Sequence, residues 1–534
     1  MSSSIDALLD SSARDIAAAV RAREVSAVEI TTASLARADR LGPVVGAFVR
    51  VTPELALEQA SRVDERVAAV RRNGYDGVAP DGESVHVPAA DADRLLAALL
   101  PLAGVPCPIK DLNQVAGVPM SVGAALLAAH PIVPDADDGT VTLLREAGTT
   151  MIGKTATPEF GFPPYTEPRT GPGGEIVAAR TPWDLTRGAG GSSGGAAAAV
   201  AAGIAPIAHA SDGGGSVRIP AASCGLVGFK PSRGRVSNGP LGVDGNGLAT
   251  QGVITRSVLD AALALDVLCR AWPGEVVPSL DQRGLLPLLE YAELADPDYG
   301  GRLDAVALGL RQRRLRLGIL TEPVVAGDAV VHPQARAAAE RAAGVLEGLG
   351  LSVEPAPVPF TPQEWMAFMP LWSVGALTLP VPDEAEPMLE PLTRWLREIG
   401  RGVTGAQYAT AVAEAQRVAR ATARAWDSFD AVITPSLAGP PAPVGAIRND
   451  ADPARDFEDQ KRFTPWTSIA NICGRPSVSV PIHRAAVEDG GVELPFGAML
   501  TGRIGGDPTV LELARLLELA DPWPAPPVPA VPVA

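Results

Sequence analysis

The sequence predicts an α/β fold built around a large sheet, and three observations support this prediction. From residue 102 onward, short apolar stretches alternate with alanine-rich segments of helical character, the pattern of strands sandwiched between helices. The chain has 534 residues, well above the ~250–300 at which a single core usually stops growing, so several packed layers or two lobes are expected. A content of 46% hydrophobic and 20% charged residues is that of a globular chain, and no stretch approaches the ~20 apolar residues of a membrane span.

The first 70 residues read as helices. Ser26 and Glu29 have the spacing of a capping box ahead of a helix that runs to about Ala38, and Pro53–Val70 continues the helical pattern with a proline near its first turn. Residues 71–93 contain glycine, proline and aspartate without periodicity. This segment is therefore predicted to be a loop or an insertion.

The central segment, 102–270, carries the strand and helix alternation. The predicted strands are Gly104–Ile109, Thr150–Ile152, Ile204–Ala210 and Leu226–Phe229, and the predicted helices are Thr140–Ala147, Gly195–Ala202 and Val258–Cys269. No internal repeat is visible in the sequence, which argues against a solenoid.

The last part of the chain begins with an irregular segment, 271–315, that contains proline and glycine, and it ends in a proline-rich tail at 522–534 that is expected to be extended or disordered. Between them we expect strands at Arg316–Leu320, Leu351–Val358, Phe429–Thr434 and Pro476–Pro481, and helices at His332–Leu349, within Pro362–Trp426 and at Pro508–Leu519.

Charge and composition narrow the class of partner. The formal net charge is −16, the wrong sign for coating nucleic acid or binding an anionic membrane, so small molecules or other proteins are the expected partners. The N-terminus shows no secretory signal, and four cysteines without CxxC spacing suit a reducing compartment, so a cytoplasmic location is expected. Five histidines show no ligand spacing, and neither a metal nor a cofactor is predicted.

Lysine is rare in this chain, with 4 lysines among 45 basic residues: Lys110, Lys154, Lys230 and Lys461. Arginine stays protonated at physiological pH, whereas a buried lysine can lose its proton and act as a base. Each lysine is therefore a candidate for a specific role, against the simpler interpretation that it is ordinary surface charge.

Two clusters of glycine and serine lie close together, at 190–195 (GGSSGG) and at 211–220 (SDGGGSVRIP). Consecutive N–H groups in such a run can form a concave nest that binds an anion or a developing oxyanion. Ser216 closes the second run, so its hydroxyl is expected beside the nest.

Three hypotheses account for these clusters. A phosphate-binding loop lacks support because neither cluster carries GKS or GKT, and no GxGxxG opens a helix. An α/β-hydrolase elbow fits the G-x-S-x-G pattern at 190–194 with Ser192 as nucleophile, but it needs a later histidine as base. The histidines after Ser192 stand in no suggestive context: His209, His332 and His483.

The third hypothesis is a serine hydrolase whose base is a desolvated lysine. Lys110 is the best candidate because it ends an apolar stretch, GVPCPIKD, that is expected to be a buried strand. Burial would lower the pKa of its ammonium group into a useful range.

Several motifs together give the chain a specific resemblance. They are AGVPCPIKDL around Lys110, GKTATPEFG at 153–161, RGAGGSSGG before the alanine helix, SDGGGSVRIPAASCGLVGFKPSRGRVS at 211–237, FDAVITPSLAGPP from 429 and ANICGRPSVSVPI from 470. In this order the motifs resemble the amidase signature family over residues 14–523, nearly the whole chain. The resemblance implies a large mixed, twisted sheet covered by helices on both faces, within one domain over 1–521 divided into 1–70, 102–270, 271–315 and 316–521.

The resemblance also implies roles for individual residues. Ser216 resembles the acylating nucleophile, Ser192 the bridging serine that follows a cis peptide bond from Gly191, and Lys110 the base. The oxyanion would be held by backbone N–H groups of the glycine run and of the nucleophile. The donors so implied are Gly213, Gly214, Gly215 and Ser216.

Other residues in the motifs are expected to support this network. Ser193 and Asp212 belong to that group, and Arg218 is expected to pair with Asp212 in a structural salt bridge. Lys154 and Lys230 are expected to bond backbone carbonyls, and Glu159 is expected to be structural. Cys224 is interpreted as a core thiol. Among the tryptophans, core packing and contact with an acyl or amine group both stay open for Trp365, Trp372 and Trp466.

Two features depart from the family pattern. The family often has a bulkier residue after the aspartate of the second cluster, where this chain has Gly213. The segments 71–93 and 164–179 are longer than the pattern predicts and could reshape the mouth of a pocket. YTEPR at 165–169 and the sequence after Gly215 resemble the branch of the family that contains 6-aminohexanoate cyclic-dimer hydrolase.

The expected function is hydrolysis of a small-molecule carboxamide, or of a related ester or carbamate, through an acyl-serine intermediate. Alternatives are the amidase subunit of a tRNA-dependent amidotransferase, an α/β-hydrolase-type esterase using Ser192 with His483, and a scaffold without catalysis. The resemblance also implies a homodimer. Neither the natural substrate nor the acyl pocket is predicted from the sequence.

Overall fold

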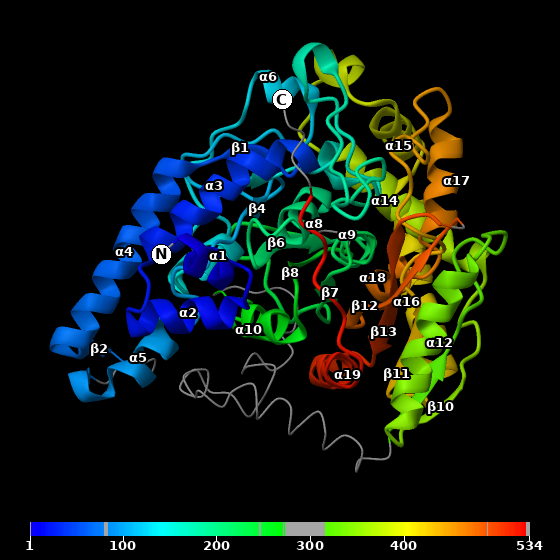
Figure 1. Ribbon diagram of the computed structural model, residues 1–534. Helices are drawn as coiled ribbons and strands as arrows, with labels where there is room; N and C mark the ends of the chain where they lie inside the picture. The colour runs from blue at the N-terminus through cyan, green and yellow to red at the C-terminus, as the bar shows by residue number, and fades with distance from the viewer. Residues whose placement is uncertain are drawn as a thin grey trace.

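The computed structural model describes residues 2–78, 84–244, 247–270, 272, 315–488 and 490–529. Figure 1 shows the arrangement of their helices and strands. The irregular segment expected at 271–315 lies almost entirely outside the described residues, as does the end of the proline-rich tail. None of the helices in the described ranges is both long enough and apolar enough to cross a membrane.

An eight-stranded mixed sheet forms the centre of the fold, in the order β10-β9-β11-β13-β12-β7-β8-β6. The pairs β10–β9 and β9–β11 are parallel and the remaining pairs are antiparallel. The strands are β6 (Ile207–Asp212), β7 (Val227–Lys230), β8 (Thr250–Thr255), β9 (Arg316–Ile319), β10 (Ser352–Pro355), β11 (Ala431–Pro435), β12 (Ser477–Ala486) and β13 (Glu493–Gly502). This is the large mixed sheet that the resemblance implied.

Helices cover both faces of this sheet. Successive side chains of a strand point to opposite faces, and in the buried strands apolar side chains point to both. On β8, Val253 packs with one core while Ile254 packs with the other. In Figure 1, α10 (Val258–Leu268) and α19 (Asp507–Ala520) lie on one side and α8 (Gly194–Ala201) and α9 (Arg218–Cys224) on the opposite side. The first side also carries α12 (Pro333–Gly348), which contacts β11, β12 and β13.

A second, three-stranded sheet has the order β1-β5-β4 and lies beside β6. In it, β4 pairs in parallel with β5, with Lys110 opposite Thr155. Its strands are β1 (Phe48–Val51), β4 (Ile109–Lys110) and β5 (Gly153–Thr155). Around it lie the early helices α1 (Ser2–Leu9), α2 (Ala13–Ala22), α3 (Ala27–Val45), α4 (Pro53–Asn73), α5 (Ala92–Leu99), α6 (Ala125–Ala129) and α7 (Gly139–Glu146).

A group of helices from the second half of the chain packs around its own apolar core, which contains Trp365, Phe368 and Phe457. These helices are α13 (Pro362–Trp365), α14 (Phe368–Leu377), α15 (Pro391–Arg401), α16 (Gly405–Ala425), α17 (Pro453–Phe463) and α18 (Thr467–Cys473). Hydrogen bonds from Thr467 and Asn471 of α18 to Gly214 and Asp212 bring this group against the second glycine cluster.

Several sequence expectations are confirmed. The capping box of Ser26 and Glu29 begins α3, with both of its hydrogen bonds formed. The helices at α4, α7, α8, α10, α12 and α19 lie where they were predicted, within a few residues.

Two local expectations were wrong, and two strands were missed. The stretch 71–93 contains a hairpin, β2 (Tyr75–Val78) and β3 (Ser84–Val87), and not only a loop. The apolar stretch 104–109 forms a regular strand only at its last residue, because its earlier part is held by isolated bonds such as Cys107 N–H to the Thr150 carbonyl. Strands β8 and β13 were not predicted, and the division into a single domain over 1–521 stays a prediction.

Candidate active site

Lys110 lies at the end of β4 and is completely buried. Its Nζ lies 2.8 Å from Ser192 Oγ, 3.1 Å from Ser211 Oγ and 3.4 Å from the Ser211 carbonyl oxygen. Burial lowers the pKa of this lysine to about 7, against the opposing attraction of Asp212. The predicted burial of Lys110 is confirmed, and near neutral pH a large fraction of this side chain is the uncharged amine.

Ser192 follows a cis peptide bond from Gly191, as the resemblance implied. Gly191 has no room for a side chain, since a Cβ there would lie 2.7 Å from the backbone of Tyr165. Behind it α8 begins at Gly194, where a Cβ would lie 2.4 Å from Thr166 Oγ1. All eight residues of α8 are glycine, alanine or valine, and all are buried. Small residues therefore hold the Ser192 backbone directly against its neighbours.

Ser216 lies in the turn between β6 and α9 and is 8% exposed. Among the described residues no protein group hydrogen-bonds its hydroxyl, so the contact from Ser216 to Ser192 is not formed in the free protein. Catalytic hydrogen bonds are often long in free enzymes and shorten when substrate binds. The structure thus brings Lys110 and Ser192 together and leaves the Ser216 hydroxyl open to the pocket.

A buried ion pair fixes the turn that carries Ser216. Asp212 Oδ1 lies 2.9 Å from Arg218 Nη2, and Asp212 Oδ2 lies 3.0 Å from Arg218 Nε. The same carboxylate accepts the backbone N–H groups of Gly215 at 2.8 Å and Val217 at 3.1 Å. Burial alone would raise the pKa of Asp212, but the charge of Arg218 and these hydrogen bonds hold it at about 2. The salt bridge predicted for Arg218 is confirmed.

Asn471, which the sequence interpretation did not single out, completes this ion pair. Its Nδ2 donates to Asp212 Oδ1 at 2.9 Å, and its Oδ1 accepts from Arg218 Nη2 at 2.8 Å. Thr467 adds two further contacts, accepting from Arg218 at its carbonyl and donating its hydroxyl to the Gly214 carbonyl, both at 2.8 Å. The motif ANICGRP was visible in the sequence, but nothing in its spacing from 212 indicated that they would meet.

The glycine run forms the expected turn. One of its N–H groups is bonded within the protein, and others have no protein acceptor. Gly215 adopts φ +138°, and a Cβ there would lie 2.6 Å from Thr467 Oγ1, so only glycine fits. Its N–H is committed to Asp212. Within the part of the chain that the structure describes, no protein acceptor takes the N–H groups of Gly213, Gly214 or Ser216. These three donors are the ones available to an oxyanion.

The other lysines and the remaining candidates have structural partners. Lys230 Nζ donates to the Pro231 carbonyl at 2.7 Å, and Lys154 bonds the Asn113 carbonyl and lies 3.5 Å from Asp111 Oδ1, as expected. Buried Glu159 accepts the Glu390 N–H at 2.8 Å, Ser193 Oγ donates to the Ser211 carbonyl at 3.3 Å, and Cys224 is a buried free thiol.

The α/β-hydrolase alternative required a histidine beside Ser192. The His483 ring nitrogen Nε2 instead lies 2.7 Å from Gln334 Oε1, and the ring lies near Phe496. Ser192 has Lys110 as its partner. The geometry therefore disfavours a histidine base. No group of three or more His, Cys, Asp or Glu side chains placed to hold a metal ion occurs in the described ranges.

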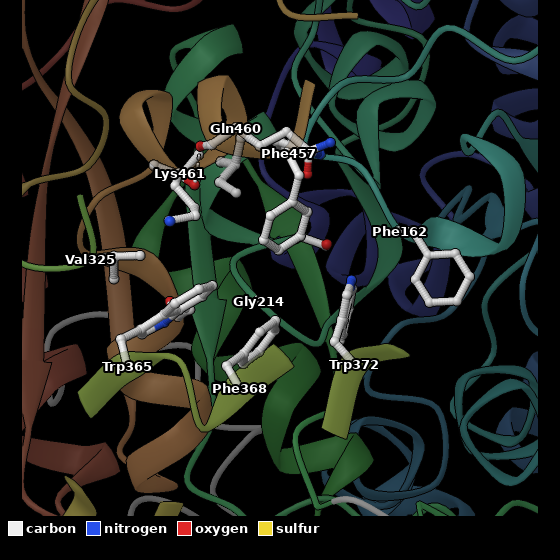
Figure 2. Close-up of a pocket in the computed structure, with 14 residues that line it drawn as sticks. Phe162, Gly214, Val325, Trp365, Phe368, Trp372, Phe457, Gln460 and Lys461 are labelled. Carbon is white, nitrogen blue, oxygen red and sulfur yellow. Dashed lines mark hydrogen bonds between the residues drawn. The ribbon is translucent and has the colours of Figure 1, made fainter. Parts of the chain in front are cut away.

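A pocket opens above Ser216 and Gly214, and Figure 2 shows its lining. Trp365, Phe368 and Trp372 stand along one side, and Phe457 faces them from α17. Trp365 and Phe368 stack at 4.9 Å between ring centroids. Trp365 and Trp372 are thus pocket residues, whereas Trp466 is buried and donates its N–H to the Glu322 carbonyl at 2.8 Å.

Sequence reasoning missed most of this pocket. Helix α17 was not predicted, and it supplies Phe457, Gln460 and Lys461. Lys461, the fourth lysine, pairs with Glu458 at 2.9 Å and lies over the Trp365 ring. The scarcity of lysine in the chain was the one sequence signal that singled out Lys461. Of the predicted insertion at 164–179, Pro164 lines the pocket and Tyr165 lies behind Gly191.

Comparisons with known proteins show which family the chain resembles along its length. A family model described as Amidase matches residues 82–511. A putative amidase from Synechocystis sp. is 34% identical, covering 95% of this chain and 88% of that protein. The 6-aminohexanoate-cyclic-dimer hydrolase of Paenarthrobacter ureafaciens is 31% identical over 84% of this chain and 90% of its own length.

Solved structures with a similar fold include a 6-aminohexanoate cyclic dimer hydrolase, with a TM-score of 0.78 and 28% identity over 96% of this chain and 98% of that one. A bacterial aryl acylamidase of the amidase signature family is similar with a TM-score of 0.74 and 25% identity, covering 96% of each chain.

Proposed function

The chain belongs to the amidase signature family and hydrolyses an amide C–N bond, and on that premise we propose that the reaction passes through an acyl intermediate on Ser216, with Ser192 and Lys110 moving the proton. The observation that carries the proposal is the 2.8 Å contact between the buried Lys110 Nζ and Ser192 Oγ, beside the turn that bears Ser216.

In the first half of the reaction, Ser216 Oγ attacks the amide carbonyl and forms a C–O bond. Its proton passes to Ser192 Oγ while the Ser192 proton passes to the neutral amine of Lys110. The charge that develops on the carbonyl oxygen is stabilised by N–H groups of Gly213, Gly214 and Ser216, each such donor contributing about 3–4 kcal/mol in known acyl-transfer sites.

In the second half, the C–N bond breaks as the proton held by Lys110 returns through Ser192 to the departing nitrogen, which leaves as an amine. A water molecule then attacks the acyl carbon and gives its proton through Ser192 to Lys110. As the C–O bond to Ser216 breaks, that proton returns through Ser192 to Ser216 Oγ, and a carboxylic acid is released. The low pKa of Lys110 suits both directions of transfer, because the amine must accept and return a proton near neutral pH.

The lining of the pocket supports a proposal for the substrate class. Its aromatic lining suits a carboxamide with an apolar or planar group, and an ester or carbamate of similar shape could react at the same serine. Two similar proteins are named as a hydrolase of the 6-aminohexanoate cyclic dimer and as an aryl acylamidase. Linear and cyclic amides are therefore among the substrates to test.

The test is covalent labelling. A fluorophosphonate should modify Ser216, and peptide mass spectrometry should locate the adduct there and not on Ser192. A panel of aryl, primary and cyclic amides should be hydrolysed by the wild-type chain and not by Ser216→Ala. Hydrolysis that survives in Ser216→Ala would refute the proposal, and glutaminase activity requiring a second subunit would identify an amidotransferase instead.

We also propose a cytoplasmic location and a homodimer. The four cysteines are all free thiols and all buried, which suits a reducing compartment. The homodimer rests on the family resemblance, and light scattering on the purified chain would test it.

A further inference from the structure

Trp372 occupies a fixed place in the pocket, next to the turn that carries Ser216. Its indole ring meets the Phe162 ring edge to face at 5.4 Å and stacks on the Phe368 ring at 5.1 Å. In Figure 2 the ring stands between these two side chains, with its nitrogen directed toward the interior of the pocket. Two aromatic neighbours therefore hold the direction in which the indole N–H points.

The indole N–H of Trp372 lacks a protein partner. Trp365, in the same pocket, donates to Ser468 Oγ at 2.9 Å, and Trp426 donates to the Pro357 carbonyl at 3.0 Å. Over the ranges that the structure describes, no protein acceptor receives the Trp372 N–H. A tryptophan in an apolar setting usually finds an acceptor for this group, so an unpaired N–H aimed into a substrate pocket indicates a donor to substrate.

Gly213 explains why the indole can take this place. A Cβ on Gly213 would lie 3.3 Å from Cζ3 and 3.4 Å from Cη2 of Trp372, tighter than ordinary van der Waals contact. The edge of the indole thus rests directly on the turn whose N–H groups face the oxyanion. A larger side chain at 213 would displace the ring.

We propose that Trp372 determines specificity by donating its indole N–H to a hydrogen-bond acceptor of the substrate, and that glycine at 213 is the residue that admits the indole. The inference rests on the proposed function, because it concerns substrates that acylate Ser216. The acceptor is an oxygen, such as an ether or carbonyl, carried by the acyl or the amine part of the amide.

The experiment compares isosteric substrates that differ in one acceptor oxygen. For the acyl part, the pair is the methoxyacetyl and butyryl 4-nitroanilides, and for the amine part it is N-(2-methoxyethyl)acetamide and N-butylacetamide. Trp372→Phe keeps an aromatic ring and removes the N–H. In one of the pairs it should lower kcat/KM for the oxygen-bearing member about three- to tenfold relative to its hydrocarbon partner.

The matched control is Trp365→Phe, the same change at a tryptophan of the same pocket whose N–H is already bonded to Ser468. It should leave the ratio of the paired substrates within about twofold of wild type, well inside the loss expected for one hydrogen bond. Gly213→Ala should reduce the same ratio as Trp372→Phe, because its methyl group displaces the indole. Each ratio is taken on one preparation, so a partly unfolded variant does not alter it.

Equal changes in both members of both pairs for Trp372→Phe would overturn the inference, as would a ratio that Trp365→Phe shifts as much. The two proposals fail separately. If Ser216→Ala is inactive while Trp372→Phe leaves every ratio unchanged, only the specificity inference is wrong. If Ser216→Ala keeps its activity, the acyl-serine proposal is wrong.

Discussion

The turn that carries Ser216 and the helices that face it across the pocket are built in different ways. Around the turn, from α8 to α9, most residues are glycine, alanine or serine, and a buried ion pair between Asp212 and Arg218 holds the backbone. Across the pocket, α13, α14 and α17 present large rings that hold one another by stacking. The residues proposed to break the bond are thus fixed by charge and close packing, and the rings proposed to contact the substrate are fixed by one another.

The interactions that hold the two sides differ in free energy. Breaking a buried ion pair by removing one partner costs about 3–5 kcal/mol, whereas an aromatic pair contributes about 0.5–1.5 kcal/mol beyond its buried area. Changes on the Ser216 side should therefore abolish the reaction or unfold the chain. Changes on the aromatic side should alter which substrates react.

The largest loss of activity is expected from Ser216→Ala. Removing the proposed nucleophile should lower kcat/KM by about 10⁴-fold or more while substrate still binds, because the N–H donors and the pocket are unchanged. Steady-state rates with an aryl amide measure the loss, and equilibrium binding of the same amide checks that the pocket persists. A fall of less than tenfold would contradict the assignment of the nucleophile.

Lys110→Met should lower kcat/KM by about 10²–10⁴-fold, the usual effect of removing a general base. The comparison variant is Lys154→Met, because Lys154 is also buried, on the adjacent strand, but faces Asp111. That change should leave an unpaired carboxylate and lower stability by about 3–5 kcal/mol in urea unfolding.

His483→Ala should leave kcat/KM near wild type, and a large loss there would revive the histidine-based alternative.

Arg218→Leu should destabilise the chain by about 3–5 kcal/mol, because it leaves the buried carboxylate of Asp212 without its counter-charge. Urea unfolding followed by circular dichroism measures the effect. An exposed pair such as Arg316–Glu354 is the matched control, and its removal should cost ~1 kcal/mol or less. Equal losses for the two pairs would mean that Arg218 does not fix the turn.

Activity should rise with pH as Lys110 loses its proton. With a pKa of about 7, the neutral fraction and so kcat/KM should increase about tenfold from pH 6 to pH 8, then level off. Lys230 is also buried with a pKa lowered to about 7, so Lys230→Met serves as the control and should keep the midpoint. A midpoint that disappears in Lys230→Met would assign the titration to Lys230 and contradict its assignment to Lys110.

The smallest effect is expected on the aromatic side. Phe368→Leu removes a stacking partner of both Trp365 and Trp372, and should raise KM for bulky aryl amides a few-fold, in keeping with about 0.5–1.5 kcal/mol per ring pair, with kcat for a small amide almost unchanged. Michaelis–Menten kinetics on both substrates measure the difference. An equal loss of kcat on both would show that this side also orders the reacting groups.

The residues around Ser216 were more predictable from sequence than the strands that carry them. The residues proposed to carry the reaction lie in short motifs, so Lys110, Ser192, Ser216 and the Asp212–Arg218 pair could all be singled out from the sequence. The cis bond before Ser192 followed from the resemblance and is present. The strand positions were less predictable, because the segment before Lys110 is bonded by isolated bridges that leave no periodic pattern.

The pocket could not be predicted because its residues come from separate parts of the chain. Phe162, Phe368 and Phe457 are each an ordinary core aromatic in their local sequence, and only the tertiary fold brings them around one pocket. Asn471 lies 259 residues from Asp212 in the chain, yet the two are in contact. Long-range packing of this kind leaves no local signal.

The buried helix α8 has a consequence for protein engineering. A Cβ on Gly195 would lie 2.3 Å from the Ala156 backbone nitrogen, so the helix has no slack in which a new side chain could be placed. Randomised libraries that include this helix would consist mostly of misfolded members. Diversity introduced at 162, 365, 368, 372 and 457 would instead sample new selectivities on an unchanged reaction centre, and natural divergence among paralogues should concentrate at the same places.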